Sequence, residues 1–184
     1  MHYKMACVLL AWLVLQQPAL ADDENDDQER KESGWLKVGV LASVANVDKD
    51  EDFDQVEVFL THSLPWKKDG EVWNVRTQLD LTAGAIADKE KETHMGSIGP
   101  RVIFHDKAGP IIFDFGIRAT ILGDDKLGQR DVDGPFHFTS HFRIGFYLPG
   151  KLELGCRVQH MSNAGLSDRN PGLDLVAVDL ARWF

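Results

Sequence analysis

Apolar side chains recur at every second position through most of this chain, and that spacing is what a β-strand with two different faces requires. The pattern is clearest in residues 111–121 and 136–148, where Phe, Ile and Leu alternate with Asp, Arg, His and Thr. No segment has a convincing helical period. The chain is therefore predicted to be all-β, with eight strands at residues 36–44, 56–60, 73–83, 98–104, 111–121, 136–148, 152–162 and 173–184.

Eight such strands can close into a barrel in two ways. A soluble lipocalin-like barrel turns the apolar face inward, whereas a membrane barrel turns it outward against lipid and fills its interior with polar groups. Several strands reach the roughly ten residues that a tilted strand needs to cross a bilayer. Phe184, an aromatic C-terminus, is typical of barrels delivered to the outer membrane. The prediction is an eight-stranded antiparallel transmembrane β-barrel of the outer membrane, with the lipocalin-like barrel as the alternative.

The links between the strands fall into two classes. Short links, such as the two-residue turn Pro149-Gly150, alternate with links that are longer on average, as they do at the two rims of outer-membrane barrels. The longer ones include Asn46–Asp52, Leu122–Gly134 and Asn163–Gly172. Charges of both signs occupy the polar face, and we expect them to pair inside the barrel as a structural plug. The arginines are Arg76, Arg118, Arg143 and Arg157, and the acids are Glu57, Asp80 and Asp114.

The first 21 residues have the layout of a secretory signal peptide. Lys4 precedes the apolar run Ala6–Leu15, and Ala19-Leu20-Ala21 gives the small-x-small pattern that a signal peptidase cuts. That run is too short to span a bilayer as a helix, which needs about 20 residues. We therefore expect a signal peptide at residues 1–21, an acidic flexible leader at 22–33 and the β-barrel at 34–184.

The composition argues against several functions. A net charge of −9, without a basic stripe, argues against a protein that grips nucleic acid. Two cysteines without a CxxC motif provide neither a zinc ribbon nor a disulfide framework. His137 and His141 share one face of a strand and are expected to be polar filler rather than metal ligands. We expect no metal and no cofactor.

The last two strands bring three polar side chains to the apolar face. Residues i and i+2 of a strand share a face, so His160 and Ser162 both project from the lipid-facing side. If the hairpin folds about Ser167, Asp174 lies directly opposite His160, within hydrogen-bonding range on the same face. Polar groups that face lipid cost free energy and usually serve a function.

A carboxylate, an imidazole and a hydroxyl are the groups that a serine esterase uses. The carboxylate orients the imidazole, the imidazole accepts the hydroxyl proton, and the hydroxyl oxygen attacks an ester carbonyl. Asn163 and nearby backbone N–H groups are candidates for the oxyanion site. Gly165 and the turn Asn170-Pro171-Gly172 are expected to shape the loop. The alternative is that all these groups are ordinary polar residues of an exposed rim.

The segment QHMSNAGLSDRNPGLD, residues 159–174, strongly resembles the PagL family of lipid A deacylases. The resemblance rests on His160-x-Ser162-Asn163-Ala164-Gly165 followed by Asn170-Pro171-Gly172, and it extends to Gly134-Pro135-Phe136-His137-Phe138. It implies an eight-stranded outer-membrane barrel that removes the 3-O-linked acyl chain from lipid A. It also implies that Ser162 is the nucleophile, His160 the base and Asn163 an oxyanion contributor. Asp174 stands where the best-known members have Glu, a side chain one methylene longer.

Residue pattern and resemblance together predict a serine esterase in the outer membrane of a Gram-negative bacterium, with lipid A of lipopolysaccharide as its substrate. The catalytic motif lies in the last hairpin, near the outer leaflet. Two other functions stay open: an outer-leaflet phospholipase with the same triad, and a non-catalytic barrel. A homodimer is also left open. The expected site consists of Ser162, His160 and Asp174, surrounded by Asn163, Ala164, Gly165, Asn170, Pro171 and Gly172.

Overall fold

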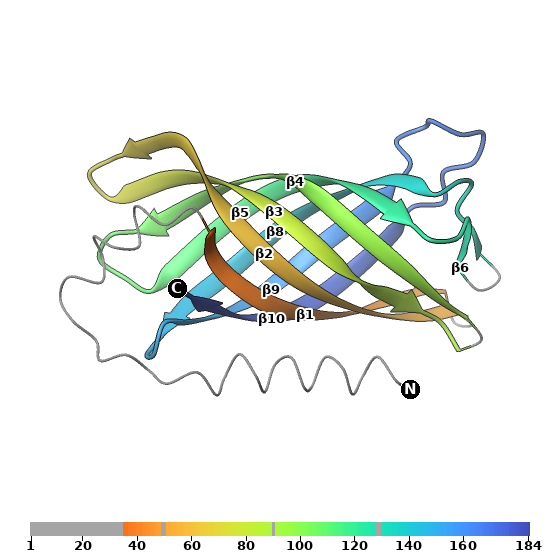
Figure 1. Cartoon of the computed structure of the whole chain (residues 1–184), viewed down its shortest axis with the longest axis horizontal. Helices are drawn as coiled ribbons and strands as arrows, with labels where there is room; N and C mark the ends of the chain where they lie inside the picture. The colour runs from red at the N-terminus through yellow and green to blue at the C-terminus, as the bar shows by residue number, and fades with distance from the viewer. Residues whose placement is uncertain (1–34, 49–50, 90, 128–129) are drawn as a thin grey trace.

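A computed structural model describes residues 35–48, 51–89, 91–127 and 130–184, so the expected signal peptide and leader lie outside the described residues. Its main feature is one closed antiparallel barrel with the order β1-β10-β9-β8-β5-β4-β3-β2 (Figure 1). The barrel strands are β1 (Trp35–Asp48), β2 (Glu51–Asp69), β3 (Trp73–Ala87), β4 (Glu92–Asp106), β5 (Ile111–Leu122), β8 (Phe136–Leu148), β9 (Leu152–Ser162) and β10 (Leu173–Trp183). A separate two-stranded ribbon, β6 (Lys126–Leu127) with β7 (Arg130–Asp131), lies in the link between β5 and β8.

The barrel carries its apolar side chains on the outside and its charges on the inside. Val44, Ile121 and Val176 are each about 60% exposed on the outer wall, whereas the arginine and carboxylate side chains at alternate positions are buried. The prediction of an eight-stranded antiparallel transmembrane barrel is confirmed. The lipocalin-like alternative is wrong, because it would turn the apolar face inward. Among the described residues, no helix is long and apolar enough to cross a membrane.

Ion pairs fill the middle of the barrel. Arg143 on β8 donates two hydrogen bonds to Asp179, at 2.8 and 2.6 Å, and a third to Asp114 at 3.2 Å. The same guanidinium lies 2.7 Å from Glu153. Because charges buried away from water need partners, this network lets charged side chains occupy the interior. The other interior pairs include Arg118–Glu57 (3.1 Å), Arg101–Asp80 (3.2 Å) and Lys37–Glu153 (2.7 Å).

One arginine expected inside the barrel lies elsewhere. Arg76 pairs with Asp69 at 2.5 Å, and both side chains are partly or largely exposed to solvent. The register of β2 against β3 shifts between Ser63 and Lys67, and the hairpin beyond that shift projects past the barrel wall (Figure 1). The expectation for Arg76 is therefore wrong, because its strand continues beyond the barrel interior.

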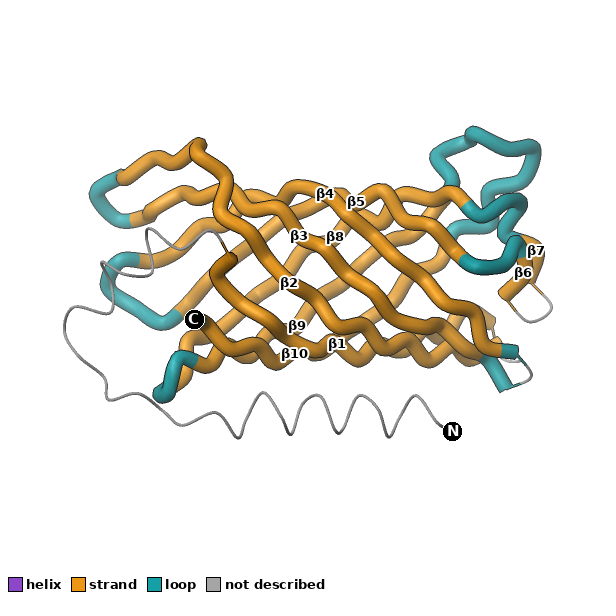
Figure 2. Tube along the Cα trace, in the orientation of Figure 1, coloured by secondary structure: helices purple, strands orange, loops and turns teal. Residues whose placement is uncertain are grey.

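The two ends of the barrel differ, and the two long links that lead into β8 and β10 lie at the same end (Figure 2). We call the end that bears the links 123–135 and 163–172 the loop end, and the opposite end, where β10 finishes, the C-terminal end. At the loop end, Leu127 and Val132 pack in an apolar cluster with Met161, Leu173 and other buried side chains. At the C-terminal end, the buried ring of Trp183 lies 4.9 Å from the Lys37 ammonium, a cation–π contact.

Two of the expected links differ from the structure. The expected long link Asn46–Asp52 is almost entirely strand, because β1 runs to Asp48 and β2 starts at Glu51. The turn after β8 has three residues, 149–151, since Leu148 pairs with Leu152. Gly150 and Lys151 both adopt left-handed backbone conformations there, with φ of 77° and 60°. The long links 123–135 and 163–172 are as expected and both lie at the loop end.

Candidate active site

Strand pairing places His160 and Asp174 directly opposite each other on the outer wall, as predicted. Asp174 Oδ1 lies 2.7 Å from His160 Nδ1. The two side chains are 87% and 52% exposed, respectively. A carboxylate at Nδ1 fixes the imidazole tautomer that leaves Nε2 able to accept a proton. The shorter Asp side chain therefore reaches the imidazole within the regular pairing of the hairpin.

Ser162 is the next residue along β9 on the same face as His160. It is half-buried and stands opposite Phe138 of β8. In the described part of the chain, Ser162 Oγ makes no hydrogen bond to the imidazole. The carboxylate–imidazole contact is thus formed, and the hydroxyl–imidazole contact is not. Hydrogen bonds between catalytic groups are often loose without substrate and tighten when it binds.

Gly172 supports the imidazole from the other side. Its φ is +58°, a left-handed conformation that favours glycine. A Cβ built on Gly172 would lie 3.0 Å from His160 Cε1 and 3.6 Å from Nε2. The proton-accepting edge of the imidazole therefore rests against a residue without a side chain, and a methyl group there would push the ring away from its place beside Asp174.

Gly172→Ala is expected to slow acylation of Ser162 by a fluorophosphonate probe about tenfold, since small displacements of a base are costly. Gly150→Ala is the matched control. It has a similar φ of +77° and open space around the new methyl group, so both variants carry a backbone strain of about 1–2 kcal/mol. Equal labelling rates for the two variants would show that Gly172 does not hold the imidazole.

Asn163 organises the loop that follows Ser162. Its buried side chain accepts a hydrogen bond from the Gly165 N–H at 3.0 Å and donates one to the Arg169 carbonyl at 2.6 Å. Its own N–H donates to Asn170 Oδ1 at 3.1 Å. Gly165 and Asn170 thus bond to Asn163, and their role in shaping a site stays a prediction. The expected role of Asn163 at an oxyanion site stays a prediction, since its amide and its N–H already bond within the loop.

The backbone turn after Ser162 leaves one donor open. Ala164 and Gly165 have φ of 55° and 78°. The N–H groups of Asn163 and Gly165 are both bonded to side-chain oxygens of the loop. In the described structure, the Ala164 N–H has no such partner. Ala164 is also an exposed residue.

Sequence reasoning missed Ser140, which the register places opposite His160 on β8. Its side chain is exposed on the outer wall, so the imidazole lies between Asp174 on one strand and Ser140 on the other. A three-residue turn at 149–151 keeps apolar residues opposite apolar residues across the hairpin of β8 and β9, whereas a two-residue turn does not. Counting back from the three-residue turn places Ser140 opposite His160. Asp131, Asp133 and Arg169 were also missed, because they meet through two irregular loops.

Aromatic side chains border the site on β8. Phe136 and Phe138 pack edge-to-face with ring centroids 5.3 Å apart, and Phe138 stands opposite Ser162. A separate apolar groove of about 320 Å³ lies further along the outer wall, lined by Trp73, Phe104, Phe113, Phe115 and Phe142. Phe142 is two residues along β8 from Ser140, so the groove starts beside the site without including the three polar groups.

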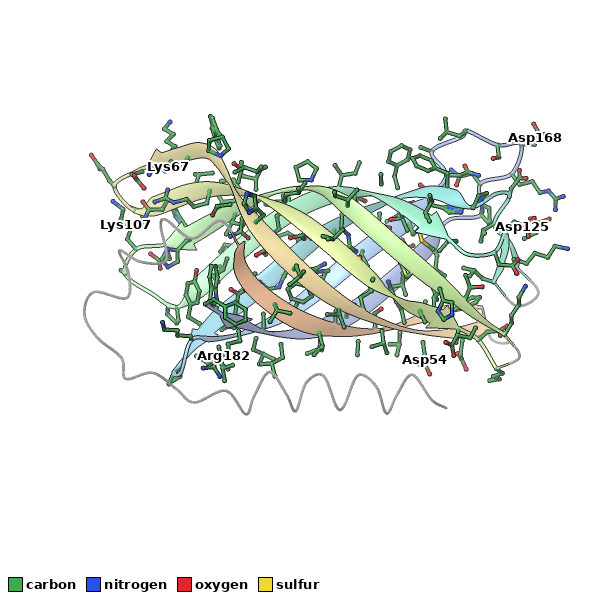
Figure 3. The ribbon with its side chains drawn as sticks, viewed as in Figure 1. Asp54, Lys67, Lys107, Asp125, Asp168 and Arg182 are labelled. Atoms are coloured by element: carbon green, nitrogen blue, oxygen red, sulfur yellow. The ribbon has the colours of Figure 1, made fainter. Side chains whose placement is uncertain are left out.

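The loop end is rich in carboxylates. Asp125 and Asp168 project there from the two long links (Figure 3). A hydrogen bond from the Lys91 side chain lowers the pKa of Asp124, in the link 123–135, to about 2. Among the described residues, no group of three or more His, Cys, Asp or Glu side chains is arranged to hold a metal ion.

Asp174→Ala is expected to lower kcat for ester hydrolysis by at least about 10²-fold, since loss of the acid that fixes the imidazole tautomer can cost up to about 10⁴ in a triad. Asp174→Glu is expected to stay within about tenfold of the wild type, since triads work with either acid. Asp168→Ala, which removes another exposed carboxylate of the same hairpin, serves as the control and should leave kcat unchanged. Loss of activity in Asp168→Ala but not in Asp174→Ala would assign the acid to Asp168.

Comparisons with known proteins identify the family of this chain. A family model described as lipid A 3-O-deacylase (PagL) matches residues 54–182, a range that contains His160, Ser162 and Asp174. The lipid A deacylase PagL of Bordetella bronchiseptica is 38% identical over 69 residues. That alignment covers 38% of this chain and 39% of the relative, so the chain matches about two fifths of that protein's length.

The fold also has a counterpart among solved structures. The crystal structure of the outer membrane enzyme PagL superposes with a TM-score of 0.64 at 16% sequence identity, and the match covers 80% of this chain and 98% of that one. At this identity the superposition shows a shared barrel fold. The family model, in contrast, matches more than two thirds of the sequence. The chain therefore belongs to the lipid A 3-O-deacylase (PagL) family.

Proposed function

We propose that this protein is a serine esterase that removes the 3-O-linked acyl chain from lipid A. The observation that carries the proposal is the 2.7 Å contact between Asp174 and His160 on the outer wall, with Ser162 on the same face. A triad on the outside of a barrel meets its substrate from the surrounding lipid and not from the interior. We orient the barrel in the outer membrane with the loop end outward, because the proposed substrate, lipid A, forms the outer leaflet of that membrane.

The proposed reaction has two half-reactions. Ser162 Oγ attacks the ester carbonyl carbon while His160 Nε2 accepts the hydroxyl proton, and Asp174 stabilises the resulting imidazolium. The tetrahedral oxyanion is held by the open N–H of Ala164. The ester C–O bond breaks, His160 returns the proton to the sugar oxygen, and an acyl-Ser162 remains. Water then attacks the acyl carbon while His160 accepts a proton from it. The bond between the acyl carbon and Ser162 Oγ breaks, His160 returns the proton to Oγ, and a fatty acid leaves.

The substrate class is the part of this proposal that needs a direct test, because the same triad would cleave phospholipid esters. The full-length protein in detergent micelles is incubated with lipid A and, separately, with phosphatidylglycerol, and the released fatty acids are analysed by mass spectrometry. We expect hydroxy fatty acid from lipid A only. Release from phosphatidylglycerol alone would make the protein a phospholipase. No release from either lipid by a folded barrel would make it non-catalytic.

A further inference from the structure

The two long links at the loop end are joined through Arg169. The backbone N–H of Arg169 donates to Asp133 Oδ2 at 2.8 Å, and its guanidinium lies 3.5 Å from Asp131 Oδ2. The links also lie close together at Gly134, where an added Cβ would stand 3.7 Å from Ser167 Oγ. Asp133 thus fixes one side of the link 163–172 to the link 123–135.

The other side of Arg169 is bonded to the residue that follows the nucleophile. The Arg169 carbonyl accepts the hydrogen bond from the Asn163 side chain at 2.6 Å, and Asn163 is 1% exposed. Asn163 also bonds the Gly165 N–H, which lies in the turn that presents the Ala164 N–H. A shift of Arg169 therefore moves the turn that contains the proposed oxyanion donor.

Asp133 is itself held in place by the barrel. Val132, the residue before it, is 6% exposed and packs in the apolar cluster of the loop end with Leu127 and Leu173. The Asp133 N–H donates to Asp131 Oδ1 at 3.1 Å. Its φ of 58° lies in the left-handed region, which Asp adopts more readily than most residues. The carboxylate is therefore presented to Arg169 from a fixed backbone.

We infer that Asp133 is a positioning residue for the reaction of Ser162, acting through Arg169 and Asn163; the inference rests on the proposed serine-esterase function. Through these hydrogen bonds, Asp133 connects the packed end of the barrel to the turn that holds the oxyanion, and it limits the movement of that turn. Misplacing a catalytic group by about 1 Å can cost about 10² in rate. Losing one of several bonds that hold this turn is expected to lower kcat about tenfold and to leave KM within about twofold, because the bond acts on the transition state and not on lipid binding.

The test compares three variants of the full chain in detergent micelles. Asp133→Ala removes the acceptor for the Arg169 N–H. Asp133→Asn keeps a side-chain oxygen that can accept the same bond, so it should restore kcat to within about threefold of the wild type. Asp125→Ala removes another carboxylate of the same link and is the matched control. kcat and KM for lipid A are measured for each, together with the heat-modifiable mobility that reports a folded barrel.

Loss of kcat in Asp133→Ala, with recovery in Asp133→Asn and no change in Asp125→Ala, is the expected result. Wild-type kcat in Asp133→Ala would overturn the inference. An equal loss in Asp133→Ala and Asp133→Asn would also overturn it, because the accepted hydrogen bond would then not be what matters.

A second readout separates this inference from the proposed function. Hydrogen exchange at the Arg169 amide is expected to accelerate at least tenfold in Asp133→Ala and not in Asp125→Ala, whether or not the protein acts on lipid A. Inactivity of the wild type on lipid A would remove the proposed function. An active wild type whose Arg169 amide exchanges equally fast in both variants would remove the role of Asp133 alone.

Discussion

Ser162→Ala is expected to lower kcat for lipid A deacylation by at least about 10³-fold, because the variant lacks the hydroxyl on which the acyl-enzyme of the proposed reaction forms. The hydroxyl is the attacking group in the proposed reaction, and alanine at this half-buried position keeps the shape of the strand. Binding of lipid A should persist, since the aromatic border of Phe136 and Phe138 is untouched. Release of hydroxy fatty acid by purified protein in micelles measures the effect.

Ser140→Ala is the control that makes the Ser162 experiment decisive. Ser140 lies opposite His160 on the neighbouring strand and is exposed on the same wall, so it is the other hydroxyl beside the imidazole. We expect this variant to keep kcat within about threefold of the wild type, since it loses no group that the proposed reaction uses. An inactive Ser140→Ala beside an active Ser162→Ala would move the nucleophile from β9 to β8.

Arg143→Met is expected to lower the free energy of unfolding by about 3–5 kcal/mol, the cost of leaving buried charges unpaired. The substitution deprives Asp179, Asp114 and Glu153 of the guanidinium that they share in the barrel interior. Space for that guanidinium depends on Gly155, where a Cβ would lie 2.3 Å from its nitrogen atoms. Urea unfolding in micelles, followed by loss of heat-modifiable mobility, measures the change.

Arg76→Met is the matched control for Arg143→Met. Arg76 also pairs with an aspartate, at 2.5 Å, but its side chain is 28% exposed and that of Asp69 is 58% exposed. Exposed pairs contribute about 0–1 kcal/mol, so this variant should unfold at nearly the wild-type urea concentration. Equal losses in the two variants would show that the interior network does not stabilise the barrel more than a surface pair does.

The alternation of apolar and polar residues predicts a barrel with two different faces, and the strand lengths and the aromatic C-terminus decide that the apolar face points outward. It also placed Asp174 opposite His160, because the last hairpin is symmetric about Ser167 and a one-residue slip would turn every apolar side chain inward. The same rule applied to the hairpin of β8 and β9 excludes the two-residue turn that was expected. With a three-residue turn, Ser140 falls opposite His160.

The features that sequence reasoning missed depend on irregular or non-local geometry. The prediction that Arg76 lies inside the barrel is wrong because of a register shift between Ser63 and Lys67. The alternation of apolar and polar residues reveals neither this shift nor how far the hairpin continues beyond it. The bond between Asp133 and the Arg169 N–H joins two loops that are 36 residues apart in sequence. Such contacts follow from the closed barrel, which brings the ends of β8, β9 and β10 together, and not from local pattern.

The mass of lipid A in cells tests the central claim most directly. A Gram-negative host whose lipid A retains its 3-O-linked acyl chain expresses either the wild type or Ser162→Ala, and both are checked for a folded barrel in the outer membrane. Loss of one hydroxyacyl chain from lipid A with the wild type alone is the result that a Ser162-dependent lipid A deacylase predicts. The same loss with both proteins, or unchanged lipid A with both, would contradict that assignment.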